Sequence, residues 1–188
     1  MTLTILLAAL SFGVGLSHPQ DLRDQVRSRG SVELHLIRDY PPVDFKTLVR
    51  GADLIARVLI TESKASLLGE EVVTDYKVQV LAVAKGSQNV ERTIITVRKP
   101  GGIVAVDGGT ISARDPEFPP FAVAEEYVVF LKATTSGYFE VRFGGQGAFK
   151  VEQGKVAQTS DIGNWNREHG RADLRELLKE IDASSKNP

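Results

Sequence analysis

The 188-residue sequence contains no cysteine, no large excess of either charge and no internal repeat. Without cysteine there are no disulfides, no thiolate catalysis, no cysteine-ligated metal and no cysteine-linked lipid anchor. Lys and Arg number 23 against 24 acidic residues, so composition gives no general attraction to nucleic acid or to an anionic membrane. With 42% hydrophobic and 25% charged residues, the composition is typical of one globular domain.

The N-terminal residues 1–17 have the pattern of a secretory signal peptide. Their apolar run, 3–16, is shorter than the roughly 20 residues that span a membrane. Gly15 and Ser17 stand at positions −3 and −1 of a cleavage site before His18. No Lys or Arg precedes the run, so a buried first helix or an uncleaved anchor is the alternative. We expect a secreted or periplasmic protein with no stable membrane span after signal cleavage.

The strongest strand pattern lies between residues 52 and 86. Tyr76, Val78 and Val80 alternate with Lys77 and Gln79, which is the period of a half-buried strand. This pattern predicts two strands joined by a polar turn, with Lys85-Gly86-Ser87 ending the second strand. Their expected ranges are 53–62 and 72–84, with the turn at 63–71. Further strands are expected at 93–99, 126–132, 139–143 and 148–151, and a hairpin at 103–114.

Many short strands with few helices predict a mainly β fold, a small antiparallel OB-like barrel with peripheral helices. Asp44 is the expected N-cap of a short helix at 45–51, closed by Gly51. Leucines at helical spacing predict one C-terminal amphipathic helix at 171–183. The expected divisions are a signal peptide at 1–17, an N-terminal arm at 18–43, the OB-like domain at 44–158, and a C-terminal linker and helix at 159–188. Within the arm, residues 18–30 are expected to be lightly structured and 31–40 to form a strand or an extended segment.

Short motifs on these strands resemble the netrin-like module, the OB-fold barrel shared with tissue inhibitors of metalloproteinases. The resemblance covers roughly residues 50–152 and implies the fold more than any activity. In the animal inhibitors a mature N-terminal cysteine chelates the zinc of the target, and this cysteine-free chain cannot do so. The chain is more similar to cysteine-free exported bacterial proteins. The motif residues are Ala52, Asp53, Lys85, Gly86, Pro100, Gly101, Gly102, Glu126 and Tyr127.

No catalytic, metal or cofactor site is expected. His18, His35 and His169 are far apart and lack the spacing of paired metal ligands. There is no nucleophile elbow, and the glycines at 144–147 are followed by neither a helix nor a P-loop lysine, which indicates a bend. One enzymatic alternative is a small secreted hydrolase that uses loop carboxylates. Its acids would be Asp115, Glu117 and Glu126.

The long connection 100–124 is the candidate binding segment. It is interrupted by glycine and proline and carries Asp115, Glu117, Phe118 and Phe121. The two phenylalanines either close the open end of the barrel or contact a partner. We expect an exported non-enzymatic module that recognises a protein or envelope component, with inhibition of a protease as one form of that recognition. Nucleic acid is not an expected partner, although an OB-type nucleic-acid binder is a second alternative.

Overall fold

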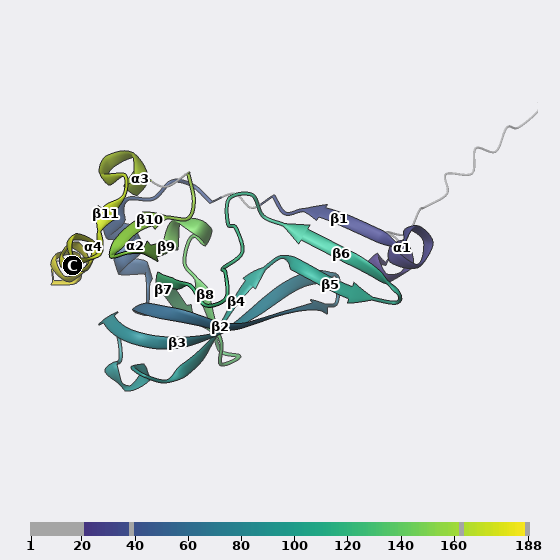
Figure 1. Cartoon of the computed structure of the whole chain (residues 1–188), viewed down its shortest axis with the longest axis horizontal. Helices are drawn as coiled ribbons and strands as arrows, with labels where there is room; N and C mark the ends of the chain where they lie inside the picture. The colour runs from purple at the N-terminus through teal and green to yellow at the C-terminus, as the bar shows by residue number, and fades with distance from the viewer. Residues whose placement is uncertain (1–20, 38–39, 162–163, 187–188) are drawn as a thin grey trace, which may run out of the picture.

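The structure, a computed structural model, describes residues 21–37, 40–161 and 164–186, and it is mainly β (Figure 1). The expected signal peptide and His18 lie outside the described residues. The helices are α1 Leu22–Arg29, α2 Phe45–Gly51, α3 Asn164–His169 and α4 Leu174–Lys186, with 3-10 turns η1 Gln88–Val90 and η2 Gly144–Gly147. The strands are β1 Ser31–His35, β2 Leu54–Leu68, β3 Glu71–Lys85, β4 Ile94–Pro100, β5 Gly102–Val106, β6 Gly109–Arg114, β7 Glu126–Ala133, β8 Phe139–Val141, β9 Ala148–Glu152, β10 Lys155–Gln158 and β11 Ala172–Asp173.

The antiparallel hairpin of β2 and β3 is the longest element of the fold. Each strand has 15 residues, and the pairing runs from Ile55 opposite Lys85 to Leu68 opposite Glu71. Tyr76, Val78 and Val80 are buried on one face, as their alternation predicts. The polar turn expected at 63–71 is wrong, because both strands continue almost to Gly69. This outer part is a strand because segments distant in the sequence pack against it.

Five strands pair in a closed circuit. β2 pairs with β3 and β7, β3 with β4, β4 in parallel with β8, and β8 with β7. The closing strand β8 meets β4 at only two positions, Val97 opposite Phe139 and Arg98 opposite Glu140. Strands β9, β10 and β11 extend the sheet beyond β7, so the sheet is not a clean barrel. The mainly β expectation is confirmed, whereas the OB-like barrel stays a prediction.

Hydrophobic residues pack on both sides of β2. Val58 and Ile60 face the inside of the circuit. Ile55 faces the other side, where α2 and α4 cover β7 and β9. Helix α4 buries Leu177 and Ile181, which confirms the C-terminal amphipathic helix. It begins at Leu174 rather than at 171, because Ala172–Asp173 pairs with β10 as β11.

The N-terminal arm forms a third packed region at the end of the molecule opposite α4 (Figure 1). Strand β1 pairs in parallel with β6, and β6 pairs with β5. Together with α1 and the outer halves of β2 and β3, these strands form what we call the tip region. The expectation of a lightly structured segment at 18–30 is wrong over its described part, because α1 is capped by Asp21 and buries Leu22 and Val26. The strand expected after it is present as β1. The core residues of the tip region are Leu22, Val26, Val32, Val72, Ile111 and Ala113.

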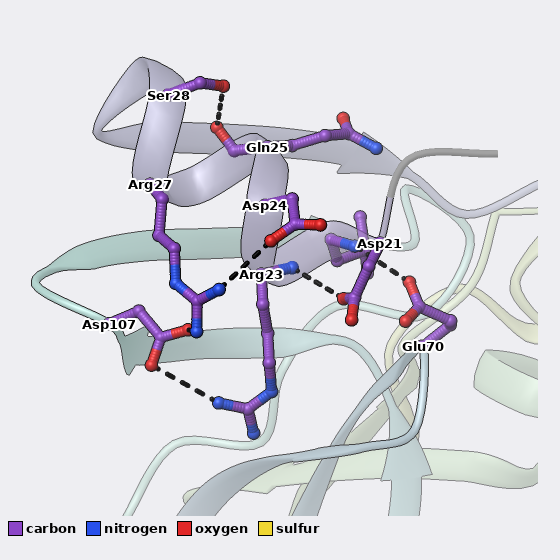
Figure 2. Close-up of polar contacts among 9 residues, drawn as sticks. Asp21, Arg23, Asp24, Gln25, Arg27, Ser28, Glu70 and Asp107 are labelled. Carbon is purple, nitrogen blue, oxygen red and sulfur yellow. Dashed lines mark hydrogen bonds and ion pairs between the residues drawn. The ribbon is translucent and has the colours of Figure 1, made fainter. Parts of the chain in front are cut away.

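Helix α1 connects the turns of two hairpins (Figure 2). The backbone N–H of Leu22 donates to Glu70 Oε2 at 3.0 Å, in the β2–β3 turn. Arg27 Nη2 lies 3.0 Å from Asp107 Oδ2, and Arg23 Nη1 lies 3.5 Å from Asp107 Oδ1, in the β5–β6 turn. The ends of both hairpins are therefore held together by one short helix.

Candidate functional site

The connection that follows β6 closes one end of the strand circuit. Phe118 and Phe121 are only 2% and 5% exposed. The ring of Phe121 lies 5.2 Å from that of Tyr76 and 4.7 Å from that of Tyr127, and 5.7 Å from that of Phe118. The structure therefore places both phenylalanines in the core.

A buried lysine holds this connection in place. Lys99 of β4 is 4% exposed, and its Nζ donates to the carbonyls of Phe118 at 2.5 Å and Pro119 at 3.0 Å. The same Nζ lies 4.1 Å from the centre of the Phe118 ring, a cation–π contact. Burial lowers the pKa of Lys99 to about 8, and the charge of Asp115 partly opposes this shift.

Sequence reasoning did not identify Lys99 as a site residue. A signal was present, because Lys99 follows Ile95 and Val97 at strand spacing and so points to the same face as those residues. Val97 is 1% exposed inside the circuit, and Lys99 is buried beside it.

Asp115 shapes the start of the connection. Its Oδ1 accepts from the backbone N–H of Glu117 at 3.0 Å, and its carbonyl accepts from the N–H of Phe118 at 3.2 Å. Asp115 is 7% exposed, and among the described residues its Oδ2 has no hydrogen-bond partner. The side chain thus forms a local turn and contributes a buried negative charge near Lys99.

An apolar cleft lies between this connection and the β5–β6 hairpin, and we call it the connection cleft. It encloses about 730 Å³. Ala65, Thr74 and Tyr76 line it from the β2–β3 hairpin, and Ile103 and Arg114 from β5 and β6. The remaining side consists of the prolines and phenylalanines of 116–121. Pro100, Gly101, Gly102, Asp115, Phe118 and Phe121 line the cleft as well, whereas Glu117 does not.

A second, more polar cleft lies where β4 and β8 separate, and we call it the cation–aromatic cleft. It encloses about 500 Å³ and shares Lys99, Pro100 and Phe118 with the connection cleft. Its other lining residues are Tyr40, Leu68, Glu71, Val73, Arg98, Lys132, Tyr138, Glu140, Val141, Arg142 and Phe143. Lys99 therefore borders both clefts.

The first group of family-like motif residues forms a structural unit away from the connection. Lys85 Nζ donates to the carbonyls of Val49 at 2.6 Å and Ala52 at 2.7 Å, which satisfies the C-terminal end of α2. Gly86 has φ +103°, and a Cβ there would lie 2.6 Å from the carbonyl oxygen of Asp53. The Asp53 carboxylate accepts from Lys132 Nζ at 2.9 Å, which lowers its pKa.

The other motif residues also have structural partners. Glu126 Oε2 accepts from Arg57 Nε at 2.8 Å, and the Tyr127 hydroxyl accepts from the N–H of Ala122 at 3.1 Å. In the Pro100-Gly101-Gly102 triplet, the carbonyl of Gly101 accepts from Thr74 Oγ1 at 2.6 Å. A Cβ on Gly102 would lie 2.3 Å from the same Oγ1, so glycine is required for this close approach.

The histidines do not gather at one site. His35 is exposed at the connection cleft, and His169 stacks on Trp165 with ring centres 4.1 Å apart. Across residues 21–37, 40–161 and 164–186, no group of three His, Asp or Glu side chains is placed to hold a metal ion. Within the same ranges, no helix is both long and apolar enough to cross a membrane.

Comparison of this chain with protein-family models gives no match, and comparison with curated proteins gives none either. Function must therefore be inferred from the geometry of the two clefts and from the sequence itself.

Proposed function

We propose that this protein is an exported, non-enzymatic binding module whose connection cleft receives an apolar segment of another protein. The observation that carries the proposal is the cleft itself, an apolar space of about 730 Å³ at the end of the strand circuit. Binding sites for small groups typically occupy about 300–1,000 Å³ and combine apolar walls with a few polar groups. The connection cleft has both properties.

The charges of the cleft suggest what the bound segment carries. Arg114 is exposed at the cleft, and Lys99 borders it from the inside. Among the described residues, Asp115 is the only carboxylate that lines the cleft, and it is buried. A bound segment that carries an apolar side chain next to a carboxylate would place the side chain against Ile103 and the carboxylate beside Arg114.

An OB-like barrel of the netrin-like kind is part of the same proposal. The five-strand circuit, with its parallel closing pair of β4 and β8, supports this assignment. The motif residues also support it. The start of β2, the end of β3 and helix α2 meet at one place, through contacts of Lys85, Gly86 and Asp53. Export depends on the signal-like residues 1–17 and implies a secreted or periplasmic location.

The test uses the full chain, expressed with its own leader, as bait for secreted and periplasmic proteins of its native host. Ile103→Glu puts a charge at the connection cleft, where Ile103 is 62% exposed, so the fold should tolerate it. Ile94→Glu is the matched control, because Ile94 is 64% exposed on β4 and borders neither cleft. We expect a protein retained by the wild type and by Ile94→Glu to be lost from Ile103→Glu. Equal retention by all three, or retention by none, contradicts the proposal.

The hydrolase alternative has less support. Of its three carboxylates, only Asp115 lines the connection cleft, while Glu126 is paired with Arg57. A hydrolase would need two carboxyls facing one bound substrate. Unchanged hydrolysis of chromogenic substrates by Asp115→Ala and Glu126→Ala variants would remove this alternative.

A further inference from the structure

We propose that the cation–aromatic cleft is a second binding site, and that it takes an uncharged sugar ring of a glycan. The proposal does not depend on the connection cleft or on its protein partner. It begins with one observation: the three cation–π contacts among the described residues all line this cleft. The pairs are Arg98 with Tyr138 at 4.3 Å, Lys99 with Phe118 at 4.1 Å and Arg142 with Phe143 at 4.4 Å.

The cleft exists because two strands stop pairing. β4 and β8 are joined only at Val97–Phe139 and Arg98–Glu140. Beyond these pairs, Lys99 and Pro100 lie on one side of the space and Val141 and Arg142 on the other. The opening therefore lies at the shortest strand pairing of the circuit. On their other edges, β4 is paired with β3 and β8 with β7.

Arg98 is held in one orientation. Its Nε and Nη2 donate to the two carboxylate oxygens of Asp75 at 2.7 and 2.8 Å. Its guanidinium also lies over the Tyr138 ring. A guanidinium fixed by two hydrogen bonds and one stacking contact retains a further edge for hydrogen bonding, at little cost in conformational entropy.

Arg142 and two acids provide the remaining polar groups. Arg142 and Glu140 are exposed on the β8 side, and Glu71 is exposed at the start of β3. Among the described residues, none of these three side chains makes an ion pair, whereas Arg98 and Lys132 are paired with Asp75 and Asp53. Charges of both signs are therefore available to a ligand in this cleft.

This balance of charge selects the class of ligand. A polyanion such as nucleic acid would meet Arg142, but Glu71 and Glu140 would repel it. Sugar hydroxyls both donate and accept, so they can donate to the two carboxylates and accept from the guanidinium groups. The apolar face of a sugar ring can pack on the partly exposed ring of Tyr138, which has Arg98 over one of its faces. Tyr40 lines the same cleft, and its ring lies against Gly144.

The experiment is calorimetric titration of the purified full chain with soluble chito-, gluco- and manno-oligosaccharides. Heparin and a single-stranded oligonucleotide serve as polyanion probes. Arg142→Ala removes the guanidinium that makes no ion pair among the described residues, and Glu140→Ala removes a carboxylate that can accept hydrogen bonds from sugar hydroxyls. Arg175→Ala, an exposed arginine on α4 that borders neither cleft, is the matched control. Circular dichroism confirms that each variant is folded, and Arg142→Gln is a second, smaller change.

We expect at least one oligosaccharide to bind, and the Arg142 and Glu140 variants to bind it about tenfold more weakly, as loss of one charge-assisted hydrogen bond implies. Arg175→Ala and the connection-cleft variant Ile103→Glu should bind it as the wild type does. Binding of none of the oligosaccharides, or binding that Arg142→Ala and Glu140→Ala leave unchanged, would overturn the proposal. Binding of heparin or DNA that Glu140→Ala strengthens would also overturn it, in favour of an anion site.

Discussion

The two ends of the β2–β3 hairpin differ in how they are held. Near Ile55 and Val80, hydrophobic clusters of fourteen and twelve buried residues cover the hairpin from its two sides. Near Leu68 and Glu71, the tip region buries six residues and depends on α1 for part of its cover. A long strand therefore does not imply uniform stability along its length. Regions with few buried apolar contacts open at lower free energy than the rest of a domain.

The largest expected effect is at the well-covered end. Phe130 of β7 is completely buried and packs against the rings of Phe45 and Phe149. Phe130→Ala should lower the free energy of unfolding by about 3–5 kcal/mol, because it removes a large side chain from a rigid site. Urea denaturation followed by circular dichroism measures this loss. A change below about 1 kcal/mol would mean that the two ends are equally loosely packed.

Lys99 lies opposite Thr74, between the two ends of the hairpin, and its effect on stability depends on pH. Its pKa of about 8 in the folded protein lies below the 10.5 of a solvated lysine. Between these values the unfolded chain binds the additional proton, so the free energy of unfolding rises with pH. Relative to Lys99→Met, the wild type should gain up to about 3 kcal/mol across this window. Urea denaturation of both proteins at intervals between these pH values measures it. A difference that does not vary with pH would show that Lys99 is solvated.

A matched truncation in the tip region should have a smaller and more local effect. Ile111 of β6 is completely buried there. Ile111→Ala should cost about 2–3 kcal/mol locally, at the low end for such changes, because a small cluster can relax around the cavity. Hydrogen exchange should show faster exchange in α1 and β1, with little change in β7. Equal acceleration in β7 would show that the two ends unfold together.

Glycines at the two ends of the hairpin give a sharper contrast. Gly86 has no room for a Cβ beside the Asp53 carbonyl, whereas nothing lies within 4 Å of a Cβ on Gly69. Gly86→Ala should destabilise by about 2–3 kcal/mol, from backbone strain and the clash together. Gly69→Ala should cost about 1 kcal/mol, because only its left-handed backbone is unfavourable for alanine. Thermal unfolding of the two variants checks the order, and the reverse order would contradict it.

The smallest effect concerns the ion pair of α1 with the β5–β6 turn. Arg27 has a side chain 60% exposed, and exposed pairs contribute about 0.2–1 kcal/mol. Arg27→Ala should therefore speed exchange in α1 slightly and leave global unfolding unchanged. Salt should reduce the difference between variant and wild type, because it screens the pair. A difference that persists in high salt would indicate lost packing instead.

The parts of the fold that sequence reasoning predicted are those with a local signal. Alternation at Tyr76–Val80 identified a strand, and helical spacing identified α4. The outer half of β2 was missed because its composition is polar. The segments that pack against it lie in the N-terminal arm and the β5–β6 hairpin, far away in the sequence. Helix α1 was also missed, although Leu22 and Val26 at a four-residue spacing were a weak signal for it.

The candidate sites divide in the same way. Proline and glycine around 100–124 indicated a loop near a site, and the connection cleft lies there. Alternation could have identified Lys99 as an inward residue. The cation–aromatic cleft had no local signal, because Arg98 lies on β4 and Arg142 directly follows β8, and these two strands meet only when the circuit closes. Strand pairing brings Arg98 to Tyr138, whereas Arg142 and Phe143 are neighbours in the sequence.

The parallel pairing of β1 with β6 has a consequence for how the chain acquires its structure. Ser31 lies opposite Thr110, and His35 opposite Arg114, so β1 has no partner until most of the strand circuit has been synthesised. The ribosome delivers the N-terminal arm before β6, and contacts this distant in sequence form slowly. β1 is therefore expected to dock only after β6 is available, and a newly made chain exposes the edge of β6 until it does.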